Sequence, residues 1–281
     1  MPWYLTLSGA EGRDIQLIID AGLIALTEVN SIAEEDQWKI AAVETKNSAI
    51  LTLQEKFIGL RIKETDFGSL IHGDGQFRWP GPEDVRLCRA RIVNLDLNTK
   101  LKANRNNGQI VFPILEWIKK LCQLHARPPQ TDWTLCLTLH GEIQWPDEVN
   151  HWTKVFLLEN FNREPIFANH CKDFLGDQLF DLVNQEGLVN FANLADEDRQ
   201  KFIMVIVPKI IAKLVHNEGW RVKTEKNLRY GGGQHAPMVT WIVKLSWDEN
   251  ASAMPDAVYR SALCEIFSGL GMVTDDGNLI K

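Results

Sequence analysis

Short apolar segments and segments with helical spacing alternate along the first half of the chain. Residues 4–7 (YLTL) predict a short strand, and apolar positions over residues 15–23 recur with a helical period. Residues 39–43 predict a second strand, and the helical pattern that follows it ends at Gly59. Because parallel strands need helical crossovers, this order predicts a parallel sheet with helices on both faces.

The same alternation continues through the middle of the chain. Residues 60–64 alternate between apolar and polar side chains, as a strand does, and residues 91–96 predict a fourth strand. Apolar residues at helical spacing over 110–124 predict a helix, and the apolar segment 133–139 predicts a fifth strand with both faces buried. Five strands with helices between them are therefore expected.

The last third of the chain predicts three helices and then a pair of long strands. The helices are predicted over residues 152–160, 167–175 and 198–217. Pro208 is expected to kink or break the third helix, because proline lacks the backbone N–H that a helix needs. Residues 220–230 and 238–247 flank a glycine-rich segment, which predicts an antiparallel hairpin. The predicted fold class is α/β: a doubly wound, mostly parallel, Rossmann-like sheet closed by a C-terminal antiparallel hairpin.

The chain shows no internal repeat, low-complexity stretch or linker before residue 248. Residues 1–247 are therefore expected to form one α/β domain. Residues 248–281 begin with acidic and small side chains and contain an apolar stripe at helical spacing over 256–267. Because an apolar stripe outside a closed core needs a cover, this C-terminal helical appendage is expected to dock on a protein partner or on a second copy of the chain.

The composition is that of a folded protein outside membranes. Of the 281 residues, 45% are hydrophobic and 24% are charged, which excludes a disordered or fibrous chain. No apolar run approaches the roughly 20 residues of a membrane helix, and residues 1–4 lack the basic start of a signal peptide. The five cysteines form no Cys-x-x-Cys pair, so we expect reduced thiols and a cytoplasmic protein.

The net charge of −7 argues against a surface that is basic all over, but it leaves room for a local patch that binds nucleic acid. One predicted strand carries four basic side chains, at Arg221, Lys223, Lys226 and Arg229. Their alternation places several charges on one face, which would suit a phosphate track. Glu225 interrupts the series, so a solvated strand face explains it equally well.

Polar and small residues follow the ends of the first four predicted strands. In a doubly wound sheet, ligands bind across the carboxyl ends of the strands, where these residues would meet. Glycines in a turn between a strand and a helix let the backbone approach a ligand and leave the N–H groups of the helix available. The candidate site residues are Gly9 and Gly12 after the first strand, Glu44 after the second, Asp66 and Phe67 after the third, and Asn94 and Asp96 at the end of the fourth.

Four segments at these strand ends resemble class I S-adenosylmethionine-dependent methyltransferases, over residues 3–247. They are LTLSGAEG (5–12), AAVET (41–45), IKETDF (62–67) and RIVNLDL (91–97), and the C-terminal hairpin resembles the closing strands of that fold. The resemblance implies S-adenosylmethionine as the cofactor, with Gly9 and Gly12 beside its methionine and ribose part. Glu44 would accept hydrogen bonds from the ribose hydroxyls and Asp66 from the adenine amino group. Phe67 would pack on the adenine ring.

Asn94 and Asp96 lie where this family contacts the methyl acceptor. Their segment resembles in position the Asn/Asp-Pro-Pro-aromatic motif of amino-methylating enzymes and the Asp-Pro-Phe-Gly motif of some transfer-RNA guanine methyltransferases, but no proline or aromatic residue follows here. An amide and a carboxylate at this position would orient a nitrogen nucleophile, such as that of a nucleic-acid base, and accept its proton. A binding-only or structural role for both residues is the alternative.

Three other interpretations are open. In the first, Glu44 would be only a solvated glutamate at a strand end, and Asp66 would be only a helix cap. A methyltransferase-like scaffold without catalysis would act as a subunit of a larger complex, which the missing proline motif and the appendage favour. A metal-dependent nuclease would use Glu44-Thr45-Lys46 with Asp20 or Asp36 as its second carboxylate. The seven histidines show no metal-ligand spacing, so no other metal site is expected.

Overall fold

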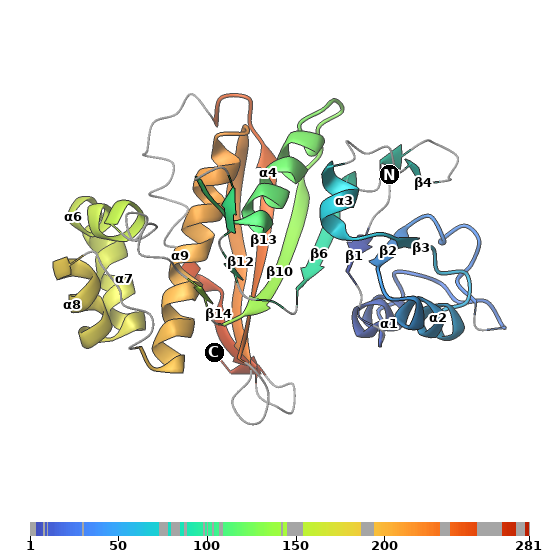
Figure 1. Cartoon of the computed structure of the whole chain (residues 1–281), viewed down its shortest axis with the longest axis horizontal. Helices are drawn as coiled ribbons and strands as arrows, with labels where there is room; N and C mark the ends of the chain where they lie inside the picture. Colours follow the sequence, from blue (N-terminus) through green and yellow to red (C-terminus); the bar gives the residue numbers. More distant parts are fainter. Residues whose placement is uncertain are drawn as a thin grey trace. The chain divides into compact units, whose positions relative to one another are not determined.

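The protein is described from a computed structural model, and its helices and strands are labelled in Figure 1. The described residues are 4–7, 9, 11–29, 31–72, 78–79, 85–86, 89–97, 99, 101–102, 104–106, 109–141, 143–144, 154–186, 194–230, 237–251, 266–273 and 279–280. The chain packs as two compact units. The first holds Met1–Asp96 and Gln123–Cys136, and the second holds Leu97–Cys122 and Leu137–Lys281. The boundary that the sequence predicts after Trp247 falls inside the second unit and stays a prediction.

Four parallel strands form the sheet of the first unit. Their order is β6, β1, β2, β3, and each neighbouring pair is parallel. The strands are β1 (Tyr4–Thr6), β2 (Ile40–Glu44), β3 (Ile62–Glu64) and β6 (Ile92–Asp96). The chain moves outward from β1 to β3 and returns to the other side of β1 with β6, as in a doubly wound sheet. The four predicted strands are confirmed, and the strand order reverses between β1 and β6.

Three helices follow the first three strands: α1 (Arg13–Asp20), α2 (Asn47–Lys56) and α3 (Phe67–His72). Helices α1 and α2 lie side by side in Figure 1. Their core-facing positions, Ile15 and Leu53, are fully buried in one cluster with residues of the strands. Other positions of the predicted apolar faces turn to solvent, since Leu17 is 67% and Leu51 is 60% exposed. The apolar face of each helix is therefore narrower than the sequence period predicts.

Long antiparallel strands dominate the sheet of the second unit. Strands β12 (Trp220–Tyr230) and β13 (Met238–Trp247) pair over their whole lengths, with a register break between Thr224 and Lys226. Strand β10 (Trp133–His140) belongs to both units and neighbours β13. The predicted hairpin and the predicted fifth strand are confirmed.

Residues of the predicted C-terminal appendage extend this sheet. Strand β14 (Leu270–Val273) pairs parallel with β12, and β15 (Leu279–Ile280) pairs antiparallel with β14. Gly269 lies so close to β12 that a Cβ there would be 2.6 Å from the carbonyl oxygen of Glu225. The predicted helix over residues 256–267 lies almost wholly outside the described residues.

Helices of the second unit precede and follow β10. They are α4 (Pro113–His125), whose last turn belongs to the first unit, the π-helix η3 (Lys154–Leu158), α6 (Glu159–Arg163), α7 (Pro165–Leu175), α8 (Asp177–Glu186) and α9 (Asp196–His216). The sequence predicts all of these segments except α8. None of the described helices has the length and apolar character needed to cross a membrane. The remaining strands of the described chain are β4 (Arg78–Trp79), β5 (Val85–Arg86), β7 (Leu101–Lys102), β8 (Asn104–Asn106), β9 (Gln109–Val111) and β11 (Ile143–Gln144).

Helix α9 continues through Pro208 instead of breaking there. Proline at position 208 removes the N–H that would bond the carbonyl of Met204, four residues earlier. The side-chain amide of Asn227, on β12, donates to that carbonyl at 2.8 Å, and Asn227 is fully buried. The neighbouring strand thus supplies the donor that the helix lacks. Of the two outcomes predicted for Pro208, the break is wrong.

Replacing Asn227 by leucine should lower the free energy of unfolding by about 1–3 kcal/mol, because the Met204 carbonyl loses its buried partner. In a Pro208→Ala background the helix regains its own N–H, so the same replacement should cost less. Urea unfolding of the four proteins of this cycle measures both values. Equal losses in the two backgrounds would show that Asn227 acts through packing and not through the Met204 carbonyl.

Candidate functional site

The carboxyl ends of the four parallel strands lie at one edge of the sheet in the first unit. The predicted site residues follow these ends and all belong to this unit: Gly9 and Gly12 after β1, Glu44 at the end of β2, Asp66 and Phe67 after β3, and Asn94 and Asp96 in β6. The reversal of strand order between β1 and β6 is where doubly wound sheets bind ligands. The strand order therefore favours a ligand site at this edge.

The two glycines of the turn after β1 differ in their surroundings. Gly12 has a φ of +54°, and a Cβ there would lie 2.5 Å from the Phe57 ring and 2.9 Å from the Leu53 side chain. Packing between α1 and α2 therefore requires a glycine at this position. Gly9 is exposed, and a Cβ there would have no described atom within 4 Å. Of the two, only Gly9 has the open space that suits the close approach of a ligand.

Glu44 ends β2 and also organises the turn that follows. Its Oε1 accepts hydrogen bonds from the backbone N–H groups of Thr45, at 2.7 Å, and Lys46, at 3.0 Å. These bonds hold the chain where α2 begins, as a side-chain cap does. Within the described contacts only Oε1 is engaged, so the second carboxylate oxygen is available to a ligand.

Asp66 caps α3. Its Oδ1 accepts a hydrogen bond from the backbone N–H of Ser69 at 2.8 Å, and its Oδ2 accepts one from the Ser69 hydroxyl at 2.5 Å. These bonds, first that from the hydroxyl, hold the pKa of Asp66 below its usual range. Phe67 is 5% exposed and packs in the core. The capping role describes Asp66 in this structure, and the contacts of Asp66 and Phe67 with adenine stay predictions.

A polar network that the sequence does not predict joins β1, α1 and β6. Asp14, in the first turn of α1, accepts through Oδ2 from the hydroxyls of Tyr4, at 2.8 Å, and Thr6, at 2.5 Å. The Asn94 amide donates to the same oxygen at 3.2 Å and to the Tyr4 hydroxyl at 2.9 Å. The parallel register sets Thr6 beside Asn94. Asn94 is therefore held by β1 and α1 at the point where the strand order reverses.

Burial and charge in this network shift two ionisable groups. Burial of Tyr4, together with the negative charge of Asp14, raises the pKa of its hydroxyl well above the usual range. The pKa of Asp96 is also raised, first because protein atoms displace water around its carboxylate and second because Asp14 lies near. The Asp96 side chain is still exposed. A carboxylate with a raised pKa that solvent reaches is suited to accept a proton.

The carboxylates that a nuclease would need have other partners. Asp36 is 5% exposed, and its oxygens accept from a backbone N–H at 2.7 Å and from the Lys39 ammonium group. Asp20 is exposed and bonds within its own helix. Across the described part of the chain, no three His, Cys, Asp or Glu side chains are grouped as metal ligands. The described contacts therefore bring neither Asp20 nor Asp36 to Glu44.

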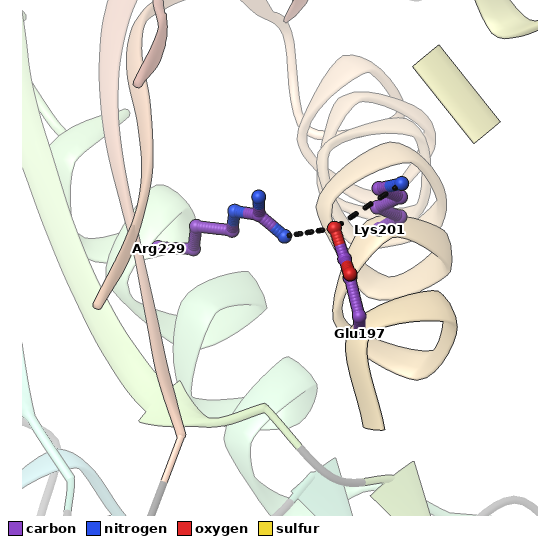
Figure 2. A network of polar contacts seen from close by, with 3 residues as sticks. All are labelled: Glu197, Lys201 and Arg229. Carbon is purple, nitrogen blue, oxygen red and sulfur yellow. Dashed lines mark hydrogen bonds and ion pairs between the residues drawn. The ribbon is translucent and has the colours of Figure 1, made fainter. Parts of the chain in front are cut away.

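Three of the four basic side chains of the predicted phosphate track on β12 are paired with carboxylates. Figure 2 shows Glu197, on α9, between Arg229 and Lys201. The ion-pair distances from Glu197 are 3.1 Å to Arg229 and 3.3 Å to Lys201. These partners, Arg229 first, hold the pKa of Glu197 below its usual range. Two further ion pairs on β12 join Arg221 to Asp248 and Lys223 to Glu225. Because these pairs offset much of the positive charge, they add no support to the predicted phosphate track.

No protein-family model matches this chain, and no curated protein matches it. Among solved structures, the chain is similar to Trm1 from Pyrococcus horikoshii in complex with S-adenosyl-L-methionine. The identity is 12% and the TM-score is 0.38, and the similarity covers 90% of this chain and 52% of that chain. This chain therefore spans about half the length of the Trm1 chain.

Replacing Asp14 by asparagine should lower the pKa of Asp96, because a negative charge near its carboxylate is removed. The pKa should stay above its ordinary value, since burial, the larger cause, remains. Because the folded protein ionises Asp96 less readily than the unfolded chain, stability falls as the pH rises from the ordinary carboxyl pKa to the raised pKa of Asp96. The variant should lose less stability over this pH range than the wild type does.

Carbon-13 NMR titration of the Asp96 carboxyl measures this shift. Asp20→Asn is the matched control, because it removes the same charge from the last turn of the same helix. An Asp96 pKa that moves equally in both variants would contradict the electrostatic effect of Asp14 on Asp96.

Proposed function

We propose that the first unit binds S-adenosylmethionine along the carboxyl edge of its sheet, and that the chain transfers the methyl group to a nitrogen acceptor on a nucleic-acid base. The strand order is the observation that carries this proposal, because it reverses between β1 and β6 and candidate side chains stand at all four strand ends. Ligands of doubly wound sheets bind at such a reversal. The resemblance at the strand ends supplies the identity of the cofactor.

Gly9 and Glu44 support the cofactor side of the proposal. The open space at Gly9 lets a ligand approach the backbone. Helix α1 begins without a side-chain cap, so its first N–H groups suit a carboxylate such as that of the methionine part. Among the described contacts Oε2 of Glu44 is not engaged, so it suits the ribose hydroxyls, which the acidic residue of dinucleotide sites binds. Asp66 and Phe67 are assigned to the adenine end.

Asn94 and Asp96 form the acceptor side of the proposal. Asn94 orients the nitrogen, which attacks the methyl carbon while the carbon–sulfur bond breaks and the sulfonium becomes a neutral thioether. The methylated nitrogen then carries a positive charge and loses its proton to the Asp96 carboxylate, whose raised pKa suits this transfer. Alignment of nitrogen, carbon and sulfur is the main requirement of such a step.

A scaffold without catalysis is the second candidate. It is favoured by the absence of a proline and an aromatic residue after Asn94, where Leu95 is instead buried in the core. Docking of a protein partner or a second copy through residues 248–281 belongs to this candidate. A cytoplasmic location suits the free thiols of Cys122 and Cys136 under either candidate. S-adenosylmethionine binding without methyl transfer to RNA or DNA would identify the scaffold.

Replacing Glu44 by alanine should weaken S-adenosylmethionine binding by about 1.5–3 kcal/mol, the usual contribution of a hydrogen bond to a charged group. Isothermal titration calorimetry measures this loss. Glu64→Ala is the control, because Glu64 lies opposite Glu44 on β3 and carries the same charge, yet should bind the cofactor as the wild type does. No heat of binding from the wild type, with S-adenosylmethionine or its demethylated product, would refute the proposed function.

The two glycines should respond differently to alanine. Gly9→Ala should bind S-adenosylmethionine several-fold more weakly at an unchanged melting temperature, because its Cβ meets the ligand and no described protein atom. Gly12→Ala should lower the melting temperature, because its Cβ meets the Phe57 ring and its φ is positive. Thermal unfolding and calorimetry on both variants give the comparison. Normal cofactor binding by Gly9→Ala would remove Gly9 from the site.

A further inference from the structure

The Asp14 carboxylate determines which atoms donate and which accept hydrogen bonds in the network between β1, α1 and β6. An ionised carboxylate only accepts hydrogen bonds, whereas a hydroxyl has one proton to donate. The hydroxyls of Tyr4 and Thr6 both donate to Asp14 Oδ2, at 2.8 Å and 2.5 Å. Each hydroxyl has then used its proton, so it can only accept from Asn94.

The Asn94 amide therefore has one orientation, in which Nδ2 faces this network. Its Nδ2 donates to the Tyr4 hydroxyl at 2.9 Å and to the Asp14 carboxylate at 3.2 Å, and it lies 3.5 Å from the Thr6 hydroxyl. None of these three partners has a proton for the amide oxygen, so a flipped amide would lose its hydrogen bonds here. Oδ1 is the end of the amide that can serve a ligand.

We propose that Asp14 is a positioning residue for the methyl acceptor, because it fixes the orientation of the Asn94 amide and so presents Oδ1 to the acceptor. This inference rests on the proposed function, in which Asn94 orients the nucleophile. Because an amide oxygen only accepts, the group held by Oδ1 must carry a hydrogen, as an amino group or a ring N–H does.

The charge of Asp14 is required for this role, and not only its shape. Asparagine at position 14 has the same shape, but its amide donates as well as accepts. Both hydroxyls could then reverse their hydrogen bonds, and the Asn94 amide could flip. Asp14 lies in the first turn of α1, where the helix dipole stabilises its negative charge. Hydrogen bonds that served only to join β1, α1 and β6 would not require a carboxylate at position 14.

The test is the side-chain amide resonance of Asn94, observed by NMR in the full chain with ¹⁵N-labelled asparagine and assigned by its loss in Asn94→Asp. A proton that is bonded to a carboxylate resonates downfield, and Asp14→Asn should move it to the range of exposed amides. Tyr4→Phe removes a hydroxyl but keeps the carboxylate, so the resonance should stay downfield. Asp20→Asn removes the same charge elsewhere on α1 and should change nothing. If Asp14→Asn does not fold, Asp14→Ser, which also donates and accepts, replaces it with the same expected shift.

An unchanged resonance in the Asp14 variant would overturn the proposal, and so would an equal shift in Tyr4→Phe, because packing would then orient the amide. Calorimetry separates these outcomes from a failure of the proposed function. The folded Asp14 variant should bind S-adenosylmethionine as tightly as the wild type, and a loss of binding would assign Asp14 to the cofactor side and overturn the proposal. A wild type that binds no S-adenosylmethionine refutes the proposed function, while the resonance still decides what orients Asn94.

Discussion

The parallel pairing of β1 with β6 is the constraint on which the candidate site depends. Its register sets Thr6 beside Asn94, and α1 brings Asp14 within hydrogen-bonding distance of both. One carboxylate oxygen then binds donors from two strands at the point where the strand order reverses. A register slip of one residue would turn the Asn94 side chain to the other face of the sheet and remove it from the network.

The sequence predicts the long strands of this fold, but it misses most of the two- and three-residue strands and the helices α3 and α8. Strands show a period of two or a short apolar run, and burial alternates along most of β13. The predicted helical pattern ends at Gly176 and so misses α8, although Leu179, Phe180 and Val183 recur there at helical spacing and are buried. The prediction of a break at Pro208 is wrong for a different reason. The effect of this proline on α9 depends on Asn227, which lies on another element and supplies the missing donor.

The strand-end residues of the site are predictable because parallel strands end at one edge of a sheet. The contacts of these residues are harder to predict. Asp14 and Tyr4 are visible in the sequence as polar positions, but they lie 80 and 90 residues from Asn94 along the chain, and only the register of β1 with β6 brings them together. The need for glycine at position 12 likewise depends on Phe57, which belongs to the segment after α2.

The central claim is that the carboxyl edge of the first unit binds S-adenosylmethionine, and a crystal structure of the chain grown with this ligand tests it most directly. We predict the ribose hydroxyls on Oε2 of Glu44, the methionine part beside Gly9 and the methyl group directed toward Asn94. A ligand bound elsewhere on the chain, or crystals without ligand at a saturating concentration, would contradict the claim.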